Sequence, residues 1–223
     1  MAKIIDKEEI SGRWAKVYAM LAKKNPMIRD QFSMFAQEIT TFISSGSMLD
    51  VGTGQGYLPI EIAQLAIDLK ITGVDLSSTM VKIASDFTLK NHLSNRLEFI
   101  QANASNLPFA DNYFDFICST ASIHHWAEPV KSLKEIIRVL KPGCEIWIYD
   151  LMCDKPTHQA KLELIKRYGR IRTFHFLNLI KKKNSIYLDK IKEFIREPGI
   201  SEHNPEIENK GVLFKLRLVK RSN

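Results

Sequence analysis

The sequence predicts an α/β fold: a doubly wound, mostly parallel sheet with helices on both faces. Three observations predict it. A strand-like segment at 47–51 is followed by glycines at every second position, Gly52, Gly54 and Gly56, and then by an amphipathic segment. Further apolar runs alternate with helix-like segments as far as residue 150. A carboxylate, Asp75, closes the second apolar run, and ligands of such sheets bind at the carboxyl ends of the strands.

Two helices are expected before the first strand. The first runs from about Lys7 to Ala22, with its apolar residues on one face. The second opens at Asn25-Pro26, where asparagine caps the helix and proline takes the first helical position. Gly46 is expected to end this second helix.

Strands and helices then alternate up to residue 150. The expected strands are Ser47–Val51, Ile71–Asp75, Leu97–Ala102, Phe114–Ser119 and Glu145–Asp150. The expected helices are Tyr57–Leu69, a segment that ends near Asn91 after candidate caps at 77–79, and Pro129–Leu140, which Lys141-Pro142-Gly143 stops.

The last third is less regular. Helical patterns run from about His158 to Tyr168 and from Ile186 to Arg196, and residues 205–209 and 212–220 predict a terminal hairpin. No repeat, low-complexity segment or linker divides the chain. Residues 1–223 are therefore expected to form a single domain.

Composition indicates an ordinary globular protein. The 223 residues are 45% hydrophobic and 26% charged. The first residues carry no apolar signal core, and no stretch approaches the length of a membrane span. The three cysteines lack paired metal spacing, so reduced thiols in a cytoplasmic protein, with no bound metal, are expected.

The basic excess of the chain lies in its last third. Residues 1–150 carry 15 Lys and Arg against 17 Asp and Glu, whereas residues 151–223 carry 17 against 8. Residues 164–188 include no acid, and their cations are Lys166, Arg167, Arg170, Arg172, Lys181, Lys182 and Lys183. Aromatic residues lie between these cations, a mixture that suits phosphates or stacked bases. A solvated basic helix is the alternative.

The glycine turn predicts a nucleoside-like cofactor. Glycine allows positive φ and close approach of a ligand, and the helix that follows offers unpaired N–H groups. A dinucleotide fold needs a third glycine where Tyr57 stands, so the spacing argues against a pyrophosphate. Asp75 is expected to accept both ribose hydroxyls. The alternatives are a turn without a ligand and, for Asp75, a helix cap or a solvated strand end.

Five segments, in this order, resemble class I S-adenosylmethionine-dependent methyltransferases, most closely the small-molecule and quinone-type subfamily. They are Leu-Asp-Val-Gly-Thr-Gly-Gln-Gly, Gly-Val-Asp-Leu-Ser, Asn-Ala-Ser-Asn-Leu-Pro-Phe, Phe-Asp-Phe-Ile-Cys-Ser and Glu-Ile-Ile-Arg-Val-Leu-Lys-Pro-Gly. The resemblance covers about residues 47–151. It implies a Rossmann-like sheet of seven strands with an antiparallel terminal strand. It also implies S-adenosyl-L-methionine as methyl donor and S-adenosyl-L-homocysteine as product.

The resemblance also implies the residues of the cofactor site. They are Asp50, Gly52, Thr53, Gly54, Asp75, Leu76, Met80, Asn103, Ala104 and Ser119. Residues at 50–54 and 119 would lie by the methionine part, Asp75 by the ribose, and residues 76, 80, 103 and 104 by the adenine. Asn103 departs from the family, which usually has an acid there that accepts from the adenine amino group. An amide oxygen can still accept that bond, but more weakly than a carboxylate.

The segment 119–126 leaves the fourth strand at the cleft and contains His124 and His125. We hypothesise a histidine general base there and favour His124. The alternative is that His-His-Trp only starts or caps the next segment. Methyl transfer by in-line displacement depends chiefly on positioning, and it needs a base only when the acceptor must lose a proton.

The ends of the chain are expected to shape the cleft. Residues 1–46 would cover the cofactor, and residues 152–200 would form a helical insertion on the substrate side. In relatives of the family an N-terminal aromatic, here Trp14 or Tyr18, closes over the cofactor; packing of that helix on the core is the alternative.

The acceptor is expected to be a small molecule, and the basic 164–188 segment suggests an anionic one. The fourth strand lacks a following Asn-Pro-Pro-Tyr or Pro-Cys, which disfavours the common base methylases. Alternatives are an RNA-directed methyltransferase that uses the basic segment, a non-catalytic cofactor- or nucleic-acid-binding module, and a nicotinamide oxidoreductase.

Overall fold

The computed structural model describes residues 25–152, 154, 156–183 and 185–222. The expected helix at 7–22, with Trp14 and Tyr18, lies outside the described residues. Among the described residues, no helix combines the length and the apolar character that crossing a membrane requires.

The centre of the fold is one sheet of seven strands in the order β3-β2-β1-β4-β5-β7-β6. The strands are β1 Ser45–Val51, β2 Asp68–Asp75, β3 Leu97–Gln101, β4 Phe114–Thr120, β5 Leu140–Leu151, β6 Glu206–Asn209 and β7 Leu213–Val219. The first five pair in parallel, whereas β7 runs antiparallel to both β5 and β6. The predicted fold class is confirmed, including the antiparallel terminal strand.

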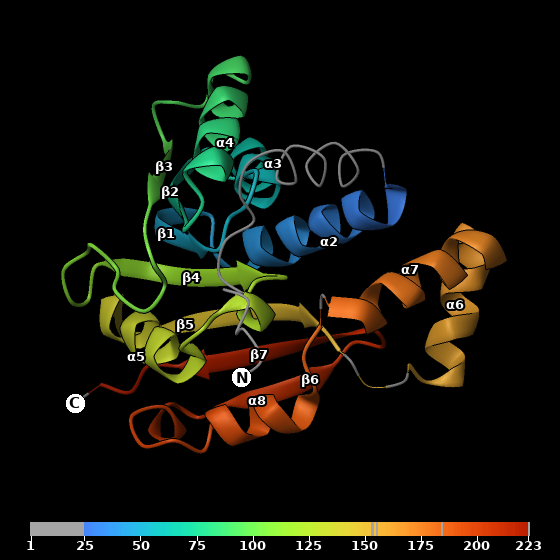
Figure 1. Ribbon diagram of the computed structural model, residues 1–223. Helices are drawn as coiled ribbons and strands as arrows, with labels where there is room; N and C mark the ends of the chain where they lie inside the picture. The colour runs from blue at the N-terminus through green and yellow to red at the C-terminus, as the bar shows by residue number, and fades with distance from the viewer. Residues whose placement is uncertain (1–24, 153, 155, 184, 223) are drawn as a thin grey trace, which may run out of the picture.

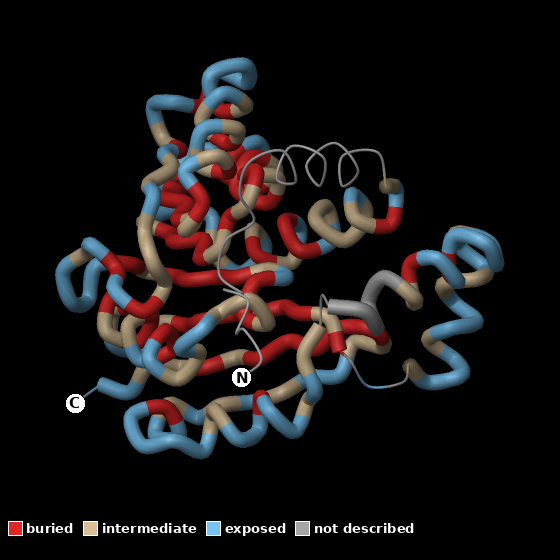
Figure 2. Tube along the Cα trace, in the orientation of Figure 1, coloured by how far each residue is buried: buried red, intermediate tan, exposed pale blue. Residues whose placement is uncertain are grey.

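Helices cover both faces of this sheet (Figure 1). They are α2 Pro26–Phe42, α3 Tyr57–Leu65, α4 Ser78–Lys90, α5 Pro129–Val139, α6 His158–Tyr168, α7 Arg170–Lys183 and α8 Leu188–Phe194. α2 and α3 pack on one face, where Trp147 and Tyr149 of β5 join their apolar core. α5 and α8 pack on the other face, against Ile146 and Ile148 of the same strand. Neighbouring residues of β5 thus serve opposite cores, and the central strands are buried (Figure 2).

Several predicted boundaries are wrong. α2 ends at Phe42 rather than at Gly46, which lies inside β1 with a φ of +97°. α3 ends at Leu65, because β2 already begins at Asp68. β5 begins at Leu140, so the expected helix stop at 141–143 belongs to the strand. Helical structure was expected in this part of the chain, but the bounds of α7 were not predicted, since only Thr173 and Phe176 of its residues with described burial are buried and no clear apolar stripe results.

Ile148 tests the dependence of the fold on its second core. Its side chain is fully buried in the middle of β5. Truncation to alanine should lower the free energy of unfolding by about 2–5 kcal/mol, because it leaves a cavity that the sheet cannot close. The matched change Ile148→Val should cost only about 1 kcal/mol. Urea titration of both variants measures this, and an alanine variant as stable as the valine variant would contradict the packing described.

Candidate active site

A cavity lies at the carboxyl ends of β1, β2 and β4. Its walls come from the turn after β1, the end of β2, the loop after β3, the loop after β4 and the first two turns of α2. Eight of the ten predicted cofactor residues line it, namely Gly52, Thr53, Gly54, Asp75, Leu76, Met80, Asn103 and Ala104. The sheet therefore brings together residues from positions 52 to 104, as the crossover topology requires.

The glycine turn is shaped for close approach. Gly52, Gly54 and Gly56 have φ values of +73°, +55° and +74°, a region that other residues rarely adopt. A Cβ on Gly52 would lie 1.8 Å from the Oγ of Ser122 in the loop after β4. A Cβ on Gly54 would meet nothing within 4 Å. Gly52 is thus required by the protein itself, whereas Gly54 exposes its backbone to the cavity.

Asp75 fixes this turn to the end of β2. Its Oδ2 accepts the backbone N–H of Gly54 at 2.8 Å, and its Oδ1 accepts that of Ser77 at 2.9 Å. Each carboxylate oxygen can accept more than one hydrogen bond, so the group can hold the turn and still accept from a ligand. The carboxylate also lines the cavity, where ribose hydroxyls could donate to it.

Asn103 uses its amide oxygen inside its own loop. The Oδ1 accepts the backbone N–H of Ser105 at 2.8 Å and the Ser105 hydroxyl at 3.0 Å. The side-chain atom left for other partners is therefore chiefly the amide nitrogen, which only donates. An adenine amino group would find a poorer acceptor here than the acid that is usual in the family.

Two predicted cofactor residues, Asp50 and Ser119, lie beneath the cavity rather than in its wall. Ser119 is buried and donates its hydroxyl to the carbonyl of Val51 at 2.7 Å. Asp50 is 1% exposed, and the Cys118 thiol donates to its Oδ1 at 3.3 Å. Burial raises the pKa of Asp50 to about 6, because the ionised form loses its hydration.

The two histidines after β4 occupy different environments. His124 is 3% exposed in its side chain, and its Nδ1 lies 2.7 Å from the Oδ1 of buried Asp150. It does not line the cavity, and its Nε2 makes no hydrogen bond with the described residues. His125 does line the cavity, and its ring lies 4.0 Å from that of His124 between centroids.

The other wall residues lie outside the predicted cofactor set, and His125 among them was the less favoured of the two candidate bases. They are Ile28, Phe32, Val51, Gln55, Tyr57, Val74, Ala102, Thr120, Ala121, Ser122, His125, Trp126 and Ser132. The two from α2 could not be found from sequence, because nothing in an apolar helix stripe says which residue faces a ligand. Ser122 and Trp126 had a weak signal, since they follow β4 at the cleft; Trp126 donates its Nε1–H to the Ser122 hydroxyl at 2.9 Å.

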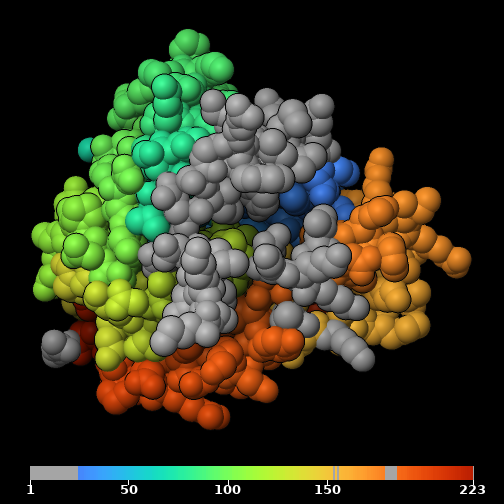
Figure 3. Space-filling model, in the orientation of Figure 1, coloured from blue at the N-terminus to red at the C-terminus, as the bar shows by residue number. Residues whose placement is uncertain are grey.

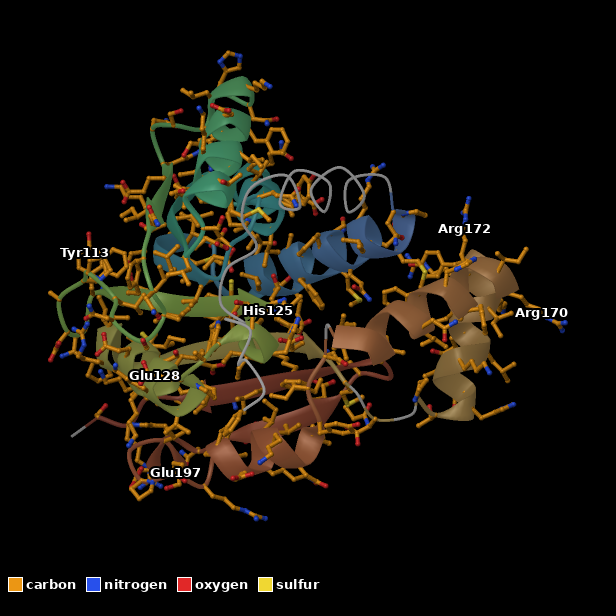
Figure 4. All side chains as sticks on the ribbon, viewed as in Figure 1. Tyr113, His125, Glu128, Arg170, Arg172 and Glu197 are labelled. Carbon is orange, nitrogen blue, oxygen red and sulfur yellow. The ribbon has the colours of Figure 1, made fainter. Side chains whose placement is uncertain are left out.

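The basic segment lies away from this cavity. None of the described wall residues comes from 152–200, and none of them is Lys or Arg. Figure 4 shows His125 near the middle of the molecule and Arg170 and Arg172 at its edge. Arg167 is turned to α2 instead, where its Nη2 lies 2.9 Å from the Oδ2 of Asp30.

The fold and this cavity define a class: a Rossmann-like protein that holds a nucleoside cofactor without a pyrophosphate. Gly54 is open to the cavity, Asp75 stands beside it, and Leu76 and Met80 offer an apolar wall. These residues suit the ribose and base of S-adenosylmethionine, which carries no phosphate for a helix N-terminus to hold.

Comparison with known proteins narrows the class. Residues 49–148 match the family described as "Methyltransferase domain". A ubiquinone/menaquinone biosynthesis C-methyltransferase, UbiE of Pseudomonas savastanoi pv. phaseolicola, is 26% identical over 189 residues, which cover 81% of this chain and 72% of the relative. The UbiE of Pseudomonas putida GB-1 is 27% identical over 177 residues, which cover 75% of this chain and 67% of the relative.

A solved structure shares the fold. The crystal structure of a Methanococcus maripaludis protein assigned as an S-adenosyl-L-methionine-dependent methyltransferase superposes with a TM-score of 0.74 at 23% identity, covering 100% of this chain and 98% of the other. This chain is an S-adenosylmethionine-dependent methyltransferase, and its residues 49–148 carry the match to the methyltransferase-domain family. It transfers a methyl group from S-adenosylmethionine to a small molecule, and S-adenosylhomocysteine is the product.

Asp50 predicts a pH dependence of stability in the cofactor-free protein. Its pKa is raised from 3.8 to about 6, so the folded protein binds the extra proton between these values. Because the folded protein binds this proton more tightly than the unfolded chain does, protonation of Asp50 increases the free energy of unfolding at low pH. This contribution is lost as the pH rises through about 6. The unfolding free energy of the protein relative to Asp50→Asn should therefore fall by about 2 kcal/mol between about pH 4 and pH 7. A constant difference across urea titrations at these pH values would refute the assignment.

Asp75 predicts the affinity for the cofactor product. Asp75→Asn should weaken S-adenosylhomocysteine binding by roughly 10- to 100-fold, because charged hydrogen bonds to the ribose are lost and the amide opposes one backbone N–H. Isothermal titration calorimetry measures this. Asn103→Asp is the matched control and should bind at least as tightly as the parent. An Asp75→Asn protein within twofold of the parent would argue against ribose binding at this carboxylate.

Proposed function

We propose that the methyl acceptor is a planar, largely apolar small molecule with an ionisable hydroxyl. The observation that carries this proposal is the chemistry of the cavity wall. Among the described wall residues, Asp75 is the acid, His125 is the imidazole, and the others are neutral. An anionic acceptor would find no Lys or Arg among these described wall residues, so the basic segment does not support the hypothesis of an anionic acceptor.

Three aromatic residues, Phe32, Tyr57 and Trp126, line the cavity. Phe32 and Tyr57 line it with ring centroids 6.1 Å apart, and Trp126 lines it from the loop after β4. Aromatic walls of this kind favour a flat acceptor by stacking and by burial of its apolar surface. The relatives named as quinone-biosynthesis C-methyltransferases support an acceptor of this shape.

We assign the proton transfer to His125. When bound, the cofactor supplies a methyl group already activated on a sulfonium. The His125 imidazole would accept the proton of the acceptor hydroxyl. The resulting oxyanion would take up the methyl group that the cofactor supplies, either at its oxygen or at a ring carbon that then loses its own proton. His125 suits this role because it lines the cavity and because imidazole is the side chain that most often acts as a general base.

His124, favoured from the sequence, is better suited to positioning. Its Nδ1 contacts Asp150, and its backbone N–H donates to the same carboxylate at 3.3 Å. This pairing ties the start of the 3₁₀ turn Ile123–His125 to the end of β5 and so fixes the place of the next residue. The cover of the cleft is proposed to include α2, because Ile28 and Phe32 line the cavity.

RNA is the second candidate acceptor. The exposed cations of α6 and α7 favour it, but the distance of this segment from the wall of the cavity does not. The purified protein should be assayed for S-adenosylhomocysteine formation with a short-chain reduced quinol, with phosphoethanolamine and with RNA. The proposal is supported if the quinol is methylated and the other two acceptors are not. It is overturned if phosphoethanolamine or RNA is methylated and the quinol is not.

Substitutions of the two histidines test which of them is the general base and which only positions it. His125→Gln should lower kcat roughly 100- to 10,000-fold with cofactor affinity unchanged, because a positioned base contributes that much. The matched change His124→Gln should lower kcat less and should also lower the melting temperature. Steady-state kinetics with the active acceptor, together with calorimetry, measures both. A larger kcat loss for His124→Gln at unchanged stability would return the base to His124.

A further inference from the structure

We propose that α6 and α7 form a docking surface for a lipid membrane that carries anionic head groups. The surface is made by Lys161, Leu162, Lys166, Arg170, Ile171, Arg172 and Phe174. Figures 1 and 3 show the two helices projecting from the body of the molecule on the side of α2. The proposal does not rest on the identity of the methyl acceptor.

The apolar part of this surface is largely exposed to solvent. Ile171 is 76% exposed, Phe174 is 65% exposed and Leu162 is 51% exposed. Ile171 and Phe174 are three residues apart and so lie on one side of α7. Thr173 and Phe176, which are buried, hold its opposite side on the body of the protein. The outward apolar side is therefore not needed for the fold.

The charge around these apolar residues has one sign. Lys161, Lys166, Arg170 and Arg172 are all exposed, and Figure 4 shows Arg170 and Arg172 pointing away from the body. The only acid in the two helices is Glu163, which lies near Gln159 of α6. Cations beside exposed apolar residues are the arrangement by which a peripheral helix binds an anionic membrane. Each cation near such a surface raises the affinity roughly fivefold.

The surface is held firmly against the part of the protein that borders the cavity. The Arg167 guanidinium and the Tyr168 hydroxyl both contact the Oδ2 of Asp30, at 2.9 Å and 2.8 Å. Asp30 lies on α2 between Ile28 and Phe32, which line the cavity. A membrane bound at α6 and α7 would thus be connected to the active site through α2.

Lipid is favoured over RNA as the partner of this surface. RNA-binding surfaces use cations for phosphates and aromatic rings for stacking. Leu162 and Ile171 are aliphatic and cannot stack on bases, but they can enter the boundary between head groups and acyl chains. The test must therefore distinguish lipid binding from binding of RNA and from binding of a second copy of the chain.

Vesicle sedimentation tests the proposal with the whole protein. We expect binding to vesicles of equal phosphatidylcholine and phosphatidylglycerol, and at least tenfold weaker binding to phosphatidylcholine alone. Arg170→Glu/Arg172→Glu and Ile171→Ser/Phe174→Ser should each lower the partition coefficient at least tenfold. The matched controls Lys190→Glu/Lys192→Glu and Leu65→Ser/Ile67→Ser change exposed residues elsewhere and should leave it within twofold.

Three results would overturn the proposal. One is equal binding, or no binding, to both kinds of vesicle by a protein whose circular dichroism is native. Another is an equal loss of binding in the control variants. The third is that the protein binds RNA more tightly than the anionic vesicles, or forms a dimer in analytical ultracentrifugation, and that the same α7 substitutions abolish this RNA binding or this dimer. None of these three results bears on methyl transfer to a quinol in free solution. A failure of the membrane proposal therefore does not contradict the proposed methyl acceptor.

Discussion

The carboxylate of Asp75 holds the site together. It accepts the N–H of Gly54 from the turn after β1 and the N–H of Ser77 at the start of α4. The carbonyl of Val74, one residue earlier, accepts the N–H groups of Gly52 and Thr53 at 2.8 Å and 2.9 Å. The end of β2 thus fixes the shape of a turn whose glycines have positive φ. Since the same carboxylate lines the cavity, we propose that cofactor binding depends on the group that also shapes the turn.

A second constraint joins this turn to the loop that carries the proposed base. Gly52 approaches Ser122 so closely that any side chain at position 52 would collide with it. The Ser122 hydroxyl in turn accepts from the Trp126 ring, and His125 lies between these two residues in the chain. The turn after β1 and the loop after β4, which carries the proposed base, are therefore packed directly against each other. Catalysis of methyl transfer by positioning requires such a fixed relation.

The sequence predicted well what depends on local pattern and less well what depends on packing. The alternation of strands and helices, the antiparallel terminal strand, the glycine turn and Asp75 followed from periodicity, from spacing and from the family resemblance. The bounds of α7 were missed because its outer side carries exposed Ile171 and Phe174, so hydrophobic periodicity does not mark its buried side. The different positions of His124, beside Asp150, and His125, in the cavity wall, could not be foreseen, because adjacent residues in a 3₁₀ turn give no sign of which one will contact β5. Asp50 and Ser119 were placed in the cofactor site by the resemblance, and the structure places both just beneath the wall of the cavity.

The most direct measurement is a crystal structure of the protein with S-adenosylhomocysteine. The account predicts both ribose hydroxyls within hydrogen-bond distance of the Asp75 carboxylate, the nucleoside against the open face of Gly54, and the sulfur directed toward the loop that carries His125. A nucleoside bound elsewhere, or a ribose that does not contact Asp75, would contradict it.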